Sequence, residues 1–371
     1  MTHDATSIIQ SIERGQLTAV ARQSTQRSSL KIQDWRVSQL GGGMGNPVSM
    51  GLYRFAGVGQ DGAEPVNWSV VLKILQSPAN VGWSNMGEGD DPSHWNYWRR
   101  ELLIYQSGLL DRLPDGLTAP RCYSATELPG HVALLWLEDV QDAYGGEWPL
   151  VRYALAARHL GRLNGRYVAE RPSYPWFGHQ ITRQWITMLP QWQTIPWQHP
   201  RVLQRYPAPD DNPFRRLLLE HERFLAALDQ MPHTLCHGDT YPTNFMSRHT
   251  ADGQEQTVAL DWALMGVEPL GHDLGQLVFG AHLNITAVPP QESTDLLFAH
   301  YLAGVQDAGC QIDLPQVRFA FAASAALRIG LFQLYLLSES LRQNDAPEAT
   351  PITHPPDCFE VLMAREAYTL L

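Results

Sequence analysis

The sequence has little of three things that mark common protein classes: cysteine, positive charge and long uninterrupted apolar runs. Its four cysteines among 371 residues lie far apart and form no CxxC pair, so neither a disulfide framework nor a zinc site is indicated. Lysine and arginine number 27 against 38 aspartates and glutamates, and the formal charge of −11 argues against nucleic acid as the main partner. An acidic protein is better suited to a cationic small substrate.

The longest apolar run, residues 319–337, carries Arg328 and Gln333 near its middle, so it predicts a buried helix rather than a membrane span. The first ten residues are polar and lack the apolar centre of a signal peptide. Hydrophobic residues make up 44 % and charged residues 18 % of the chain, an ordinary globular balance. We therefore expect a cytoplasmic protein with no membrane partner, while the sequence is silent on the oligomeric state.

The first third of the chain reads as an antiparallel sheet with one helix. β-branched and aromatic residues at strand spacing predict strands at 35–40, 48–56, 68–75, 121–124 and 131–137. The turn-rich stretch 57–67 is expected to connect two of them. Asp91 and Pro92 offer an N-cap and a first helical residue, which predicts a helix that runs to about residue 110.

After Val140 the apolar residues follow helical spacing almost throughout, for example in 151–168 and 214–228. The sequence therefore predicts an α+β fold in which a small sheet precedes a larger helical half. We expect a helical extension over residues 1–33, a sheet lobe over 34–138 and a helical lobe over 139–371.

Two short segments of the helical half carry a catalytic pattern. HGDTYPTN contains Asp239 and Asn244, and LDW contains Asp261 at the end of a strand-like run. Phosphoryl transfer to a hydroxyl group requires such residues. One carboxylate orients the hydroxyl, while an amide and a second carboxylate hold magnesium on a nucleoside triphosphate. The alternative is that these residues are ordinary loop and strand-end residues. The spacing of five residues from Asp239 to Asn244 favours the catalytic interpretation, and so do the upstream residues described below.

These segments resemble the catalytic and metal-binding segments of the aminoglycoside phosphotransferase and choline kinase group, which shares the protein-kinase fold. The resemblance implies a two-lobed kinase that uses ATP and Mg²⁺, with Asp239 as the base and Asn244 and Asp261 as metal ligands. Related protein kinases have a lysine two residues after the catalytic aspartate, where this chain has Tyr241, and this favours a small-molecule acceptor. Aminoglycoside-like, amino-alcohol and sugar-type hydroxyl acceptors all stay open, because the resemblance covers the acceptor-binding half only loosely.

A lysine upstream of these segments lies among apolar residues. Lys73 stands in VVLKIL, where a buried ammonium group needs a charged partner. Glu101 on the following helix is the expected partner, and Glu88 is an alternative. The resemblance makes Lys73 the lysine that reaches the α- and β-phosphates; a surface lysine on an edge strand is the competing interpretation.

A glycine cluster and the passage between the lobes complete the expected nucleotide site. Gly42, Gly43 and Gly45 fall between two strands, where a phosphate-covering loop belongs in similar kinases, although a plain hairpin turn explains them equally well. No GKS or GKT follows, so the cluster is not a P-loop. In similar kinases the passage from sheet to helices contacts adenine, and we expect the backbone of Glu138 to do so.

Several other residues have two interpretations. We expect His237 and Asp273 to brace the catalytic loop rather than to transfer protons. The aromatic stretch 174–206 is expected to be core, with an acceptor pocket as the alternative, and Glu268 or Asp273 could pair with an acceptor amine. A rival to the enzyme is a nucleotide-binding module that has lost catalysis and acts through partner contacts.

Overall fold

The structure is a computed structural model that describes residues 4–42, 46–81, 90–342 and 358–371. The chain divides into two compact units, each described here by itself. The first, which we call the sheet unit, comprises Met1–Gly146, Tyr174–Phe177 and Phe245–Leu264. The second, the helical unit, comprises Glu147–Ser173, Gly178–Asn244 and Met265–Leu371.

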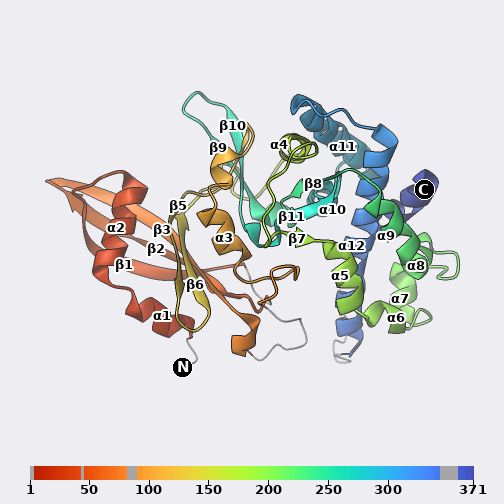
Figure 1. The fold of residues 1–371 in the computed structure, drawn as a ribbon, viewed down its shortest axis with the longest axis horizontal. Coiled ribbons are helices and arrows are strands. Elements are labelled where there is room, and N and C mark those ends of the chain that lie inside the picture. Colours follow the sequence, from red (N-terminus) through yellow and green to blue (C-terminus); the bar gives the residue numbers. More distant parts are fainter. Residues whose placement is uncertain (1–3, 43–45, 82–89, 343–357) are drawn as a thin grey trace. The chain divides into compact units, whose positions relative to one another are not determined.

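The sheet unit is built on five antiparallel strands in the order β1-β2-β3-β6-β5 (Figure 1). Their bounds are Lys31–Leu40 for β1, Ser49–Asp61 for β2, Glu64–Gln76 for β3, Cys122–Leu128 for β5 and Val132–Glu138 for β6. The expected strands are all present, but β2 and β3 continue through the stretch 57–67 that was predicted as a turn. The glycines there serve strand pairing: a Cβ on Gly57 would lie 2.0 Å from the carbonyl oxygen of Asp34 on β1.

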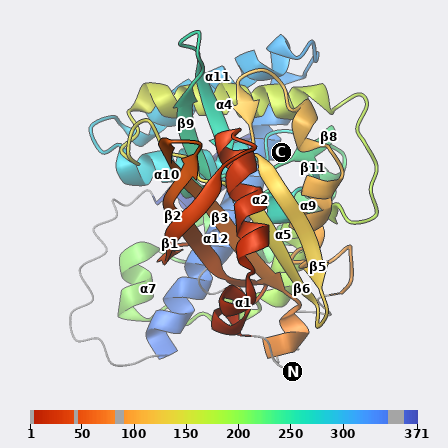
Figure 2. The same cartoon turned by 90° about the vertical axis from the view of Figure 1, so that its left-hand side faces the viewer.

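Core residues pack on both faces of this sheet, because alternate residues of its central strands point to opposite sides. On β6, Val132, Leu134 and Trp136 join a core that includes residues of α1 (Ala5–Ser11) and α2 (Arg14–Thr25). Figure 2 shows α2 lying across this face. The intervening residues Ala133, Leu135 and Leu137 belong to a second core together with Trp98 and Leu102. The N-terminal helices, expected as an extension, thus share a core with the sheet.

The helix after the sheet's third strand begins later than the sequence predicts. The structure has α3 at Arg100–Gln106 and a separate short helix, η3, at Leu110–Arg112. The reason is the buried guanidinium of Arg100, which donates to the carbonyl oxygens of Pro92, His94 and Trp95 at 2.6–3.1 Å. These bonds hold the residues before Arg100 in turns, in which the carbonyl oxygen of His94 also accepts from the N–H of Tyr97 at 3.1 Å.

A small three-stranded sheet completes the sheet unit. It has the order β4-β10-β9, with bounds Leu117–Thr118 for β4, Phe245–His249 for β9 and Glu255–Ala259 for β10. The short helix η5, Trp262–Leu264, follows β10. These residues pack with the N-terminal part of the chain, although the expected boundary after Glu138 assigned them to the helical lobe.

The helical unit contains ten α-helices among the described residues and one small sheet. The helices are α4 Leu150–Arg166, α5 Ile181–Met188, α6 Gln191–Thr194, α7 Pro200–Arg205, α8 Pro213–Leu219, α9 His221–Asp229, α10 Leu274–Asn284, α11 Pro290–Asp307, α12 Leu314–Arg342 and α13 Phe359–Leu370. The sheet has the order β7-β11-β8, with bounds Gly178–His179, Gly266–Pro269 and His233–Cys236. These strands of two to four residues are too short to give a period in the sequence.

The long apolar helix α12 is the one helix of the described residues that has the length and composition to cross a membrane. However, 78 % of its most apolar stretch is buried within the protein, as in a core helix. Arg328, near its middle, lies with its Nη1 2.8 Å from Nε2 of the buried His272. This surrounding agrees with the prediction of a buried helix.

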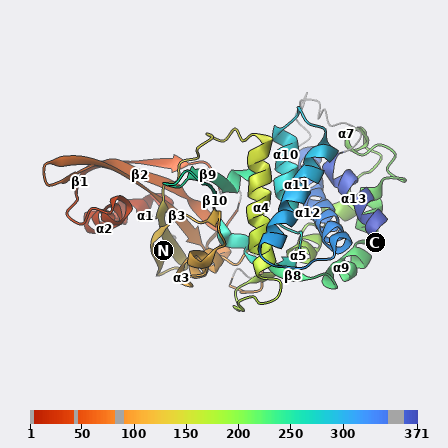
Figure 3. The same cartoon turned by 90° about the horizontal axis from the view of Figure 1, so that it is seen from above.

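Two glycines let helices α4 and α11 approach each other closely, as Figure 3 shows for the helical unit. A Cβ on Gly304 would lie 1.9 Å from the carbonyl oxygen of Arg158, and one on Gly161 would lie 2.0 Å from that of Tyr301. Both obstacles are backbone atoms, which cannot move aside as a flexible side chain can. The crossing therefore requires glycine at both positions.

We predict that Gly304→Ala lowers the free energy of unfolding by about 1–3 kcal/mol, because the added methyl group overpacks the crossing. The matched control is Gly15→Ala in α2, where an added Cβ meets no atom within 4 Å. This control is expected to gain about 0.5–1 kcal/mol from helix propensity. Denaturant titration of both variants measures the difference, and equal stabilities would contradict the close crossing.

Candidate active site

Lys73 of β3 lies between two carboxylates in the sheet unit. It pairs in register with Leu135, on the sheet face that packs against α3. Its Nζ is 2.6 Å from Oε2 of Glu101, in the first turn of α3, and 2.8 Å from Oδ1 of Asp261. Lys73 and Glu101 are 4 % and 1 % exposed, whereas the Asp261 side chain is about one-third exposed. The expected neighbour Glu101 is therefore present, and Glu88 lies outside the described residues.

The electrostatics of this group follow from burial and charge. Burial alone would lower the pKa of the Lys73 ammonium group, but Asp261 and Glu101 outweigh it and raise this pKa above its ordinary value. Burial raises the pKa of the Glu101 carboxyl, and the charge of Lys73 opposes that rise. Lys73 is thus a permanently charged ammonium group whose position is fixed by a buried and a more exposed carboxylate.

Asp261 is held at the end of β10 by its own backbone and its neighbours. Its φ of 55° is in the left-handed region, which aspartate adopts more readily than most residues. The buried indole of Trp262 donates from Nε1 to the carbonyl oxygen of Ala259 at 2.9 Å. Arg100 donates from Nη1 to the carbonyl oxygen of Ala263 at 3.0 Å and from Nε to that of Trp176 at 2.7 Å. Arg100 therefore ties the Asp261 segment to the start of α3.

In the helical unit, the loop after β8 is gripped by the buried carboxylate of Asp273. Its Oδ2 accepts from the backbone N–H of His237 at 2.8 Å, and its Oδ1 accepts from the N–H of Gly238 at 2.9 Å. The hydroxyl of Thr240 donates to the carbonyl oxygen of Asp273. Asp273 is 1 % exposed. This geometry is that of a brace.

The loop aims Asp239 with two amide side chains. Nδ2 of Asn244, in the short helix η4 (Pro242–Asn244), donates to Oδ2 of Asp239 at 2.8 Å. Nε2 of Gln276 on α10 lies 3.3 Å from Oδ1 of the same carboxylate, and its Oε1 accepts from the N–H of Thr240 at 2.7 Å. The Nδ1 of His237 accepts from the N–H of Asp239 at 3.1 Å. Each oxygen of the Asp239 carboxylate thus has a fixed donor.

Residues that the sequence analysis did not single out complete this brace. The buried Asn164 of α4 donates from Nδ2 to Oδ2 of Asp273 and to the carbonyl oxygen of Leu235, both at 3.0 Å. Its Oδ1 accepts from the hydroxyl of Tyr301 at 2.8 Å. The sequence feature that could have identified Asn164 is the presence of an asparagine inside an apolar helix. The signal for Gln276 was its position three residues after Asp273, on the same helical face.

Two of the residues expected to contact adenine or phosphate, Glu138 and Gly42, lie among the described residues. The N–H of Glu138 donates to the carbonyl oxygen of Arg121 at 2.8 Å, so this N–H is already used within the sheet unit. Its carboxylate accepts from Nη1 of Arg248 at 2.9 Å. Gly42 has a φ of +117°, a conformation that favours glycine. Gly43 and Gly45 lie outside the described residues.

The other candidates for contacts with an amine take part in structure. Glu268 is buried and accepts from the N–H of Ile181 at 2.9 Å, and burial raises its pKa to about 7. Trp176 is buried and stacks on Tyr174, with 4.6 Å between the ring centroids. Phe177 is buried beside both. In this part of the aromatic stretch the core interpretation fits the packing.

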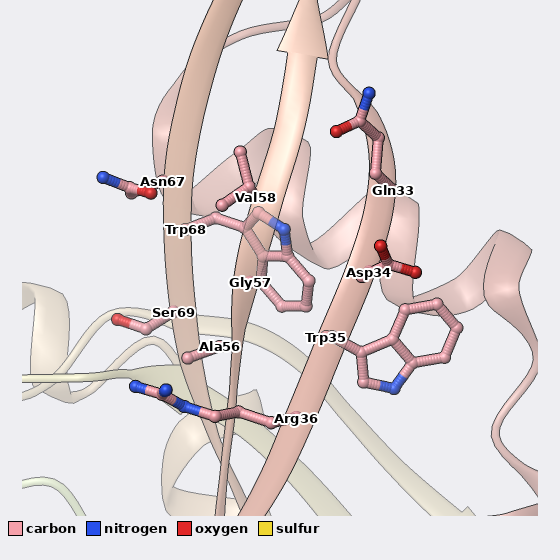
Figure 4. A pocket seen from close by; sticks show the side chains of 10 residues that line it. All are labelled: Gln33, Asp34, Trp35, Arg36, Ala56, Gly57, Val58, Asn67, Trp68 and Ser69. Atoms are coloured by element: carbon pink, nitrogen blue, oxygen red, sulfur yellow. The ribbon is translucent and has the colours of Figure 1, made fainter.

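Cavity size alone does not mark the site. A hollow of about 910 Å³ on β1, β2 and β3 is lined by ten residues, with Gln33 and Asn67 at one end and Arg36 and Ser69 at the other (Figure 4). None of the predicted site residues that the structure describes lines it. The candidate site is defined by its polar geometry instead.

The donor atoms present fit magnesium better than a metal that needs a cage of side chains. Among the described residues, no cluster of three or more His, Cys, Asp or Glu side chains could hold a metal ion. Magnesium requires few protein oxygens, because phosphate and water fill its other positions. Asn244 uses its NH₂ group on Asp239, which leaves its Oδ1 as the atom suited to a cation. In the sheet unit, considered by itself, the carboxylate of Asp261 is an oxygen donor suited to a cation.

The chain has a protein-kinase-like α+β fold, and a family of phosphotransferases matches it. Residues 111–319, more than half of the chain, match the model of the phosphotransferase enzyme family APH. The chain therefore belongs to this family, as the sequence motifs predict. It is a small-molecule phosphotransferase. No curated protein sequence matches the chain significantly.

Three solved structures that are similar to the chain have low sequence identity to it. An amicoumacin kinase, hAmiN, in complex with AMP-PNP, Ca²⁺ and Ami, is 14 % identical with a TM-score of 0.52, and the match covers 100 % of this chain and 93 % of that one. The choline kinase LicA from Streptococcus pneumoniae is 15 % identical, with coverages of 95 % and 98 % and a TM-score of 0.45. The GDP complex of aminoglycoside 2'-phosphotransferase-IIIa is 15 % identical, with coverages of 96 % and 99 % and a TM-score of 0.49.

We predict that Lys73→Met costs about 3–5 kcal/mol of stability, because it leaves the buried Glu101 carboxylate without its cation. The double variant Lys73→Met/Glu101→Leu removes both buried charges and is expected to recover more than half of this loss without recovering activity. Denaturant titration and a nucleotide-turnover assay on the same samples separate the two effects. A double variant no more stable than the single one would contradict the coupling.

Proposed function

We propose that the protein is an ATP-dependent kinase that transfers the γ-phosphate of ATP to a hydroxyl group of a small molecule. The observation that carries this proposal is the Asp239 carboxylate, which is held by Asn244 and Gln276 on a loop that Asp273 braces. A carboxylate fixed in this way is suited to orient an attacking hydroxyl, and phosphoryl transfer depends mainly on such positioning. Membership of a phosphotransferase family supports the same reaction.

In this proposal Asp239 orients the acceptor hydroxyl and takes its proton. The hydroxyl oxygen forms a bond to the γ-phosphorus, the bond from that phosphorus to the β–γ bridging oxygen breaks, and ADP leaves with the electron pair. The ammonium group of Lys73 binds the α- and β-phosphates, and Glu101 holds it in position. Gly42 and its neighbours are the proposed phosphate-covering loop. The AMP-PNP bound to the amicoumacin kinase supports ATP as the donor.

Asn244 and Asp261 are the residues proposed to hold Mg²⁺, which would neutralise charge on the triphosphate oxygens. The oxygen donors described above support this assignment, as does the Ca²⁺ in the amicoumacin kinase complex. We place the reaction in the cytoplasm. The four free cysteine thiols of the chain agree with a reducing compartment.

We predict that Asp239→Asn keeps nucleotide affinity within about threefold but lowers turnover by about 10²–10⁴-fold, as loss of a general base does. Calorimetry with ATP and Mg²⁺ measures affinity, and acceptor-dependent ADP release measures turnover. Asp252→Asn, in the exposed turn before β10, is the matched control with unchanged turnover. Normal turnover in Asp239→Asn sinks the assignment, and nucleotide binding without transfer in the unmodified protein favours the inactive binding module.

We further predict that Asp261→Asn raises the Mg²⁺ concentration for half-maximal turnover by at least about tenfold, since a neutral amide is a weaker ligand than a carboxylate. A Mg²⁺ titration at constant ATP compares this variant with Asp252→Asn. Addition of excess EDTA is expected to abolish transfer in both. An unchanged Mg²⁺ requirement in Asp261→Asn would remove this residue from the metal site.

A further inference from the structure

A second cavity lies beside the catalytic loop, within the helical unit. Its volume is about 420 Å³, within the range of small-molecule sites. Tyr241 contributes to its wall from the loop itself. The helices α10, α12 and α13 contribute most of the rest, among them Phe279, Phe332 and Phe359. We call it the aromatic pocket.

Tyr241 connects the aromatic pocket to Asp239. It stands two residues after Asp239, and its hydroxyl is close enough to Gln276 for a hydrogen bond that lowers its pKa. Gln276 is also the residue whose Nε2 lies 3.3 Å from Oδ1 of Asp239. Burial, with the charge of Asp239, raises the Tyr241 pKa to about 12, so the hydroxyl is neutral at pH 7. A molecule in the pocket therefore lies against Tyr241, which stands two residues after the proposed base and shares Gln276 with it.

The wall of the aromatic pocket is a run of rings in contact. Tyr241 and Phe279 have their centroids 6.4 Å apart at an angle of 75°, and Phe279 and Phe359 are 5.5 Å apart at 50°. His282 meets Phe359 edge-on at 5.2 Å. Such edge and face contacts leave ring surfaces that suit a flat or branched apolar ligand.

The charges that line the aromatic pocket cancel. Arg205 donates from Nη2 and Nε to Oε1 of Glu360 at 2.7 and 3.0 Å, and both residues are buried. Burial lowers the pKa of His282 to about 4, so His282 is neutral at pH 7. Oε2 of Glu360 is buried and has no hydrogen-bond partner among the residues that the structure describes. Among the described residues, the pocket wall thus offers ring surface and one carboxylate oxygen, but no excess of negative charge.

We propose that the aromatic pocket binds the acceptor, and that this acceptor is an alcohol with an apolar, ring-sized body and at most one amine, not a polycationic sugar. This inference rests on the proposed function, because it assigns the hydroxyl that Asp239 would orient. It narrows the acceptor classes open from the sequence. It differs from the expectation drawn from the net charge, since the described wall of this pocket has no counter-charges for several ammonium groups.

The first test compares acceptors with the full-length protein. The probes are 3-phenyl-1-propanol, phenylalaninol with one amine, choline as a small cation without a ring, and kanamycin as a polyamine. Acceptor-dependent ADP release and phosphate incorporation are measured at equal concentrations with ATP and Mg²⁺. We expect kcat/KM for the two phenyl compounds to exceed that for kanamycin by at least about tenfold, as apolar contacts discriminate. The reverse order overturns the inference.

The second test changes the pocket. Phe332→Ala is expected to raise the acceptor KM about tenfold while the ATP KM stays unchanged, and Leu336→Ala, on the exposed side of the same helix, is the matched control. Gln333→Glu adds one carboxylate to the pocket wall and is expected to increase the preference for phenylalaninol over 3-phenyl-1-propanol at least about fivefold. An unchanged preference, or equal effects of Phe332→Ala and Leu336→Ala, overturns the assignment.

The outcomes separate the two proposals. Transfer to kanamycin that depends on Asp239 but not on Phe332 rejects the aromatic pocket and keeps the kinase. Transfer that does not depend on Asp239 rejects the proposed function itself.

Discussion

The carboxylate of Asp273 is the group on which the arrangement around Asp239 depends. It is buried, and a buried carboxylate is costly unless its oxygens accept hydrogen bonds. Here these come from two consecutive backbone N–H groups of the catalytic loop and from the amide of Asn164. The interaction is reciprocal: the loop satisfies the carboxylate, and the carboxylate fixes the loop. Asp239 follows these two residues directly, so the position of its backbone is fixed by the same interaction.

Lys73 illustrates a different use of buried charge. One buried ammonium group faces two carboxylates, so the group of three carries a net negative charge when all are ionised. Such an arrangement is weak evidence for stability, because desolvation opposes the attraction. It does hold the ammonium group in one place. Asp261 is the more exposed of the two partners, as the proposed metal ligand would be, whereas Glu101 is enclosed and fixes the ammonium group.

The sequence predicted the α+β class, the kinase-like fold and the polar residues that stand in linear motifs, such as Asp239 and Asn244. Where a distant partner was predicted, as for Lys73 with Glu101, the resemblance to a known family indicated it; polar residues outside the motifs were not predicted. Arg100 shows the reason: in the sequence it is one of two adjacent arginines on a predicted helix. Its contacts with the carbonyls of Trp176 and Ala263 exist only after folding. Asn164 and Gln276 are similar, since their roles depend on which loop reaches them and not on local propensity.

Net charge and local charge also point in different directions in this protein. The formal charge of −11 belongs to the whole chain and governs long-range attraction and solubility. Recognition within contact distance depends on the few groups that a ligand touches. In the aromatic pocket the pairing of Arg205 with Glu360 removes the local excess of charge, and the rings of Phe279 and Phe359 provide the remaining surface. The acidity of the chain can therefore attract a cationic molecule without deciding which molecule the pocket binds. In the proposed reaction, Tyr241 links that choice to the chemistry, because it belongs to the pocket wall and stands two residues after Asp239.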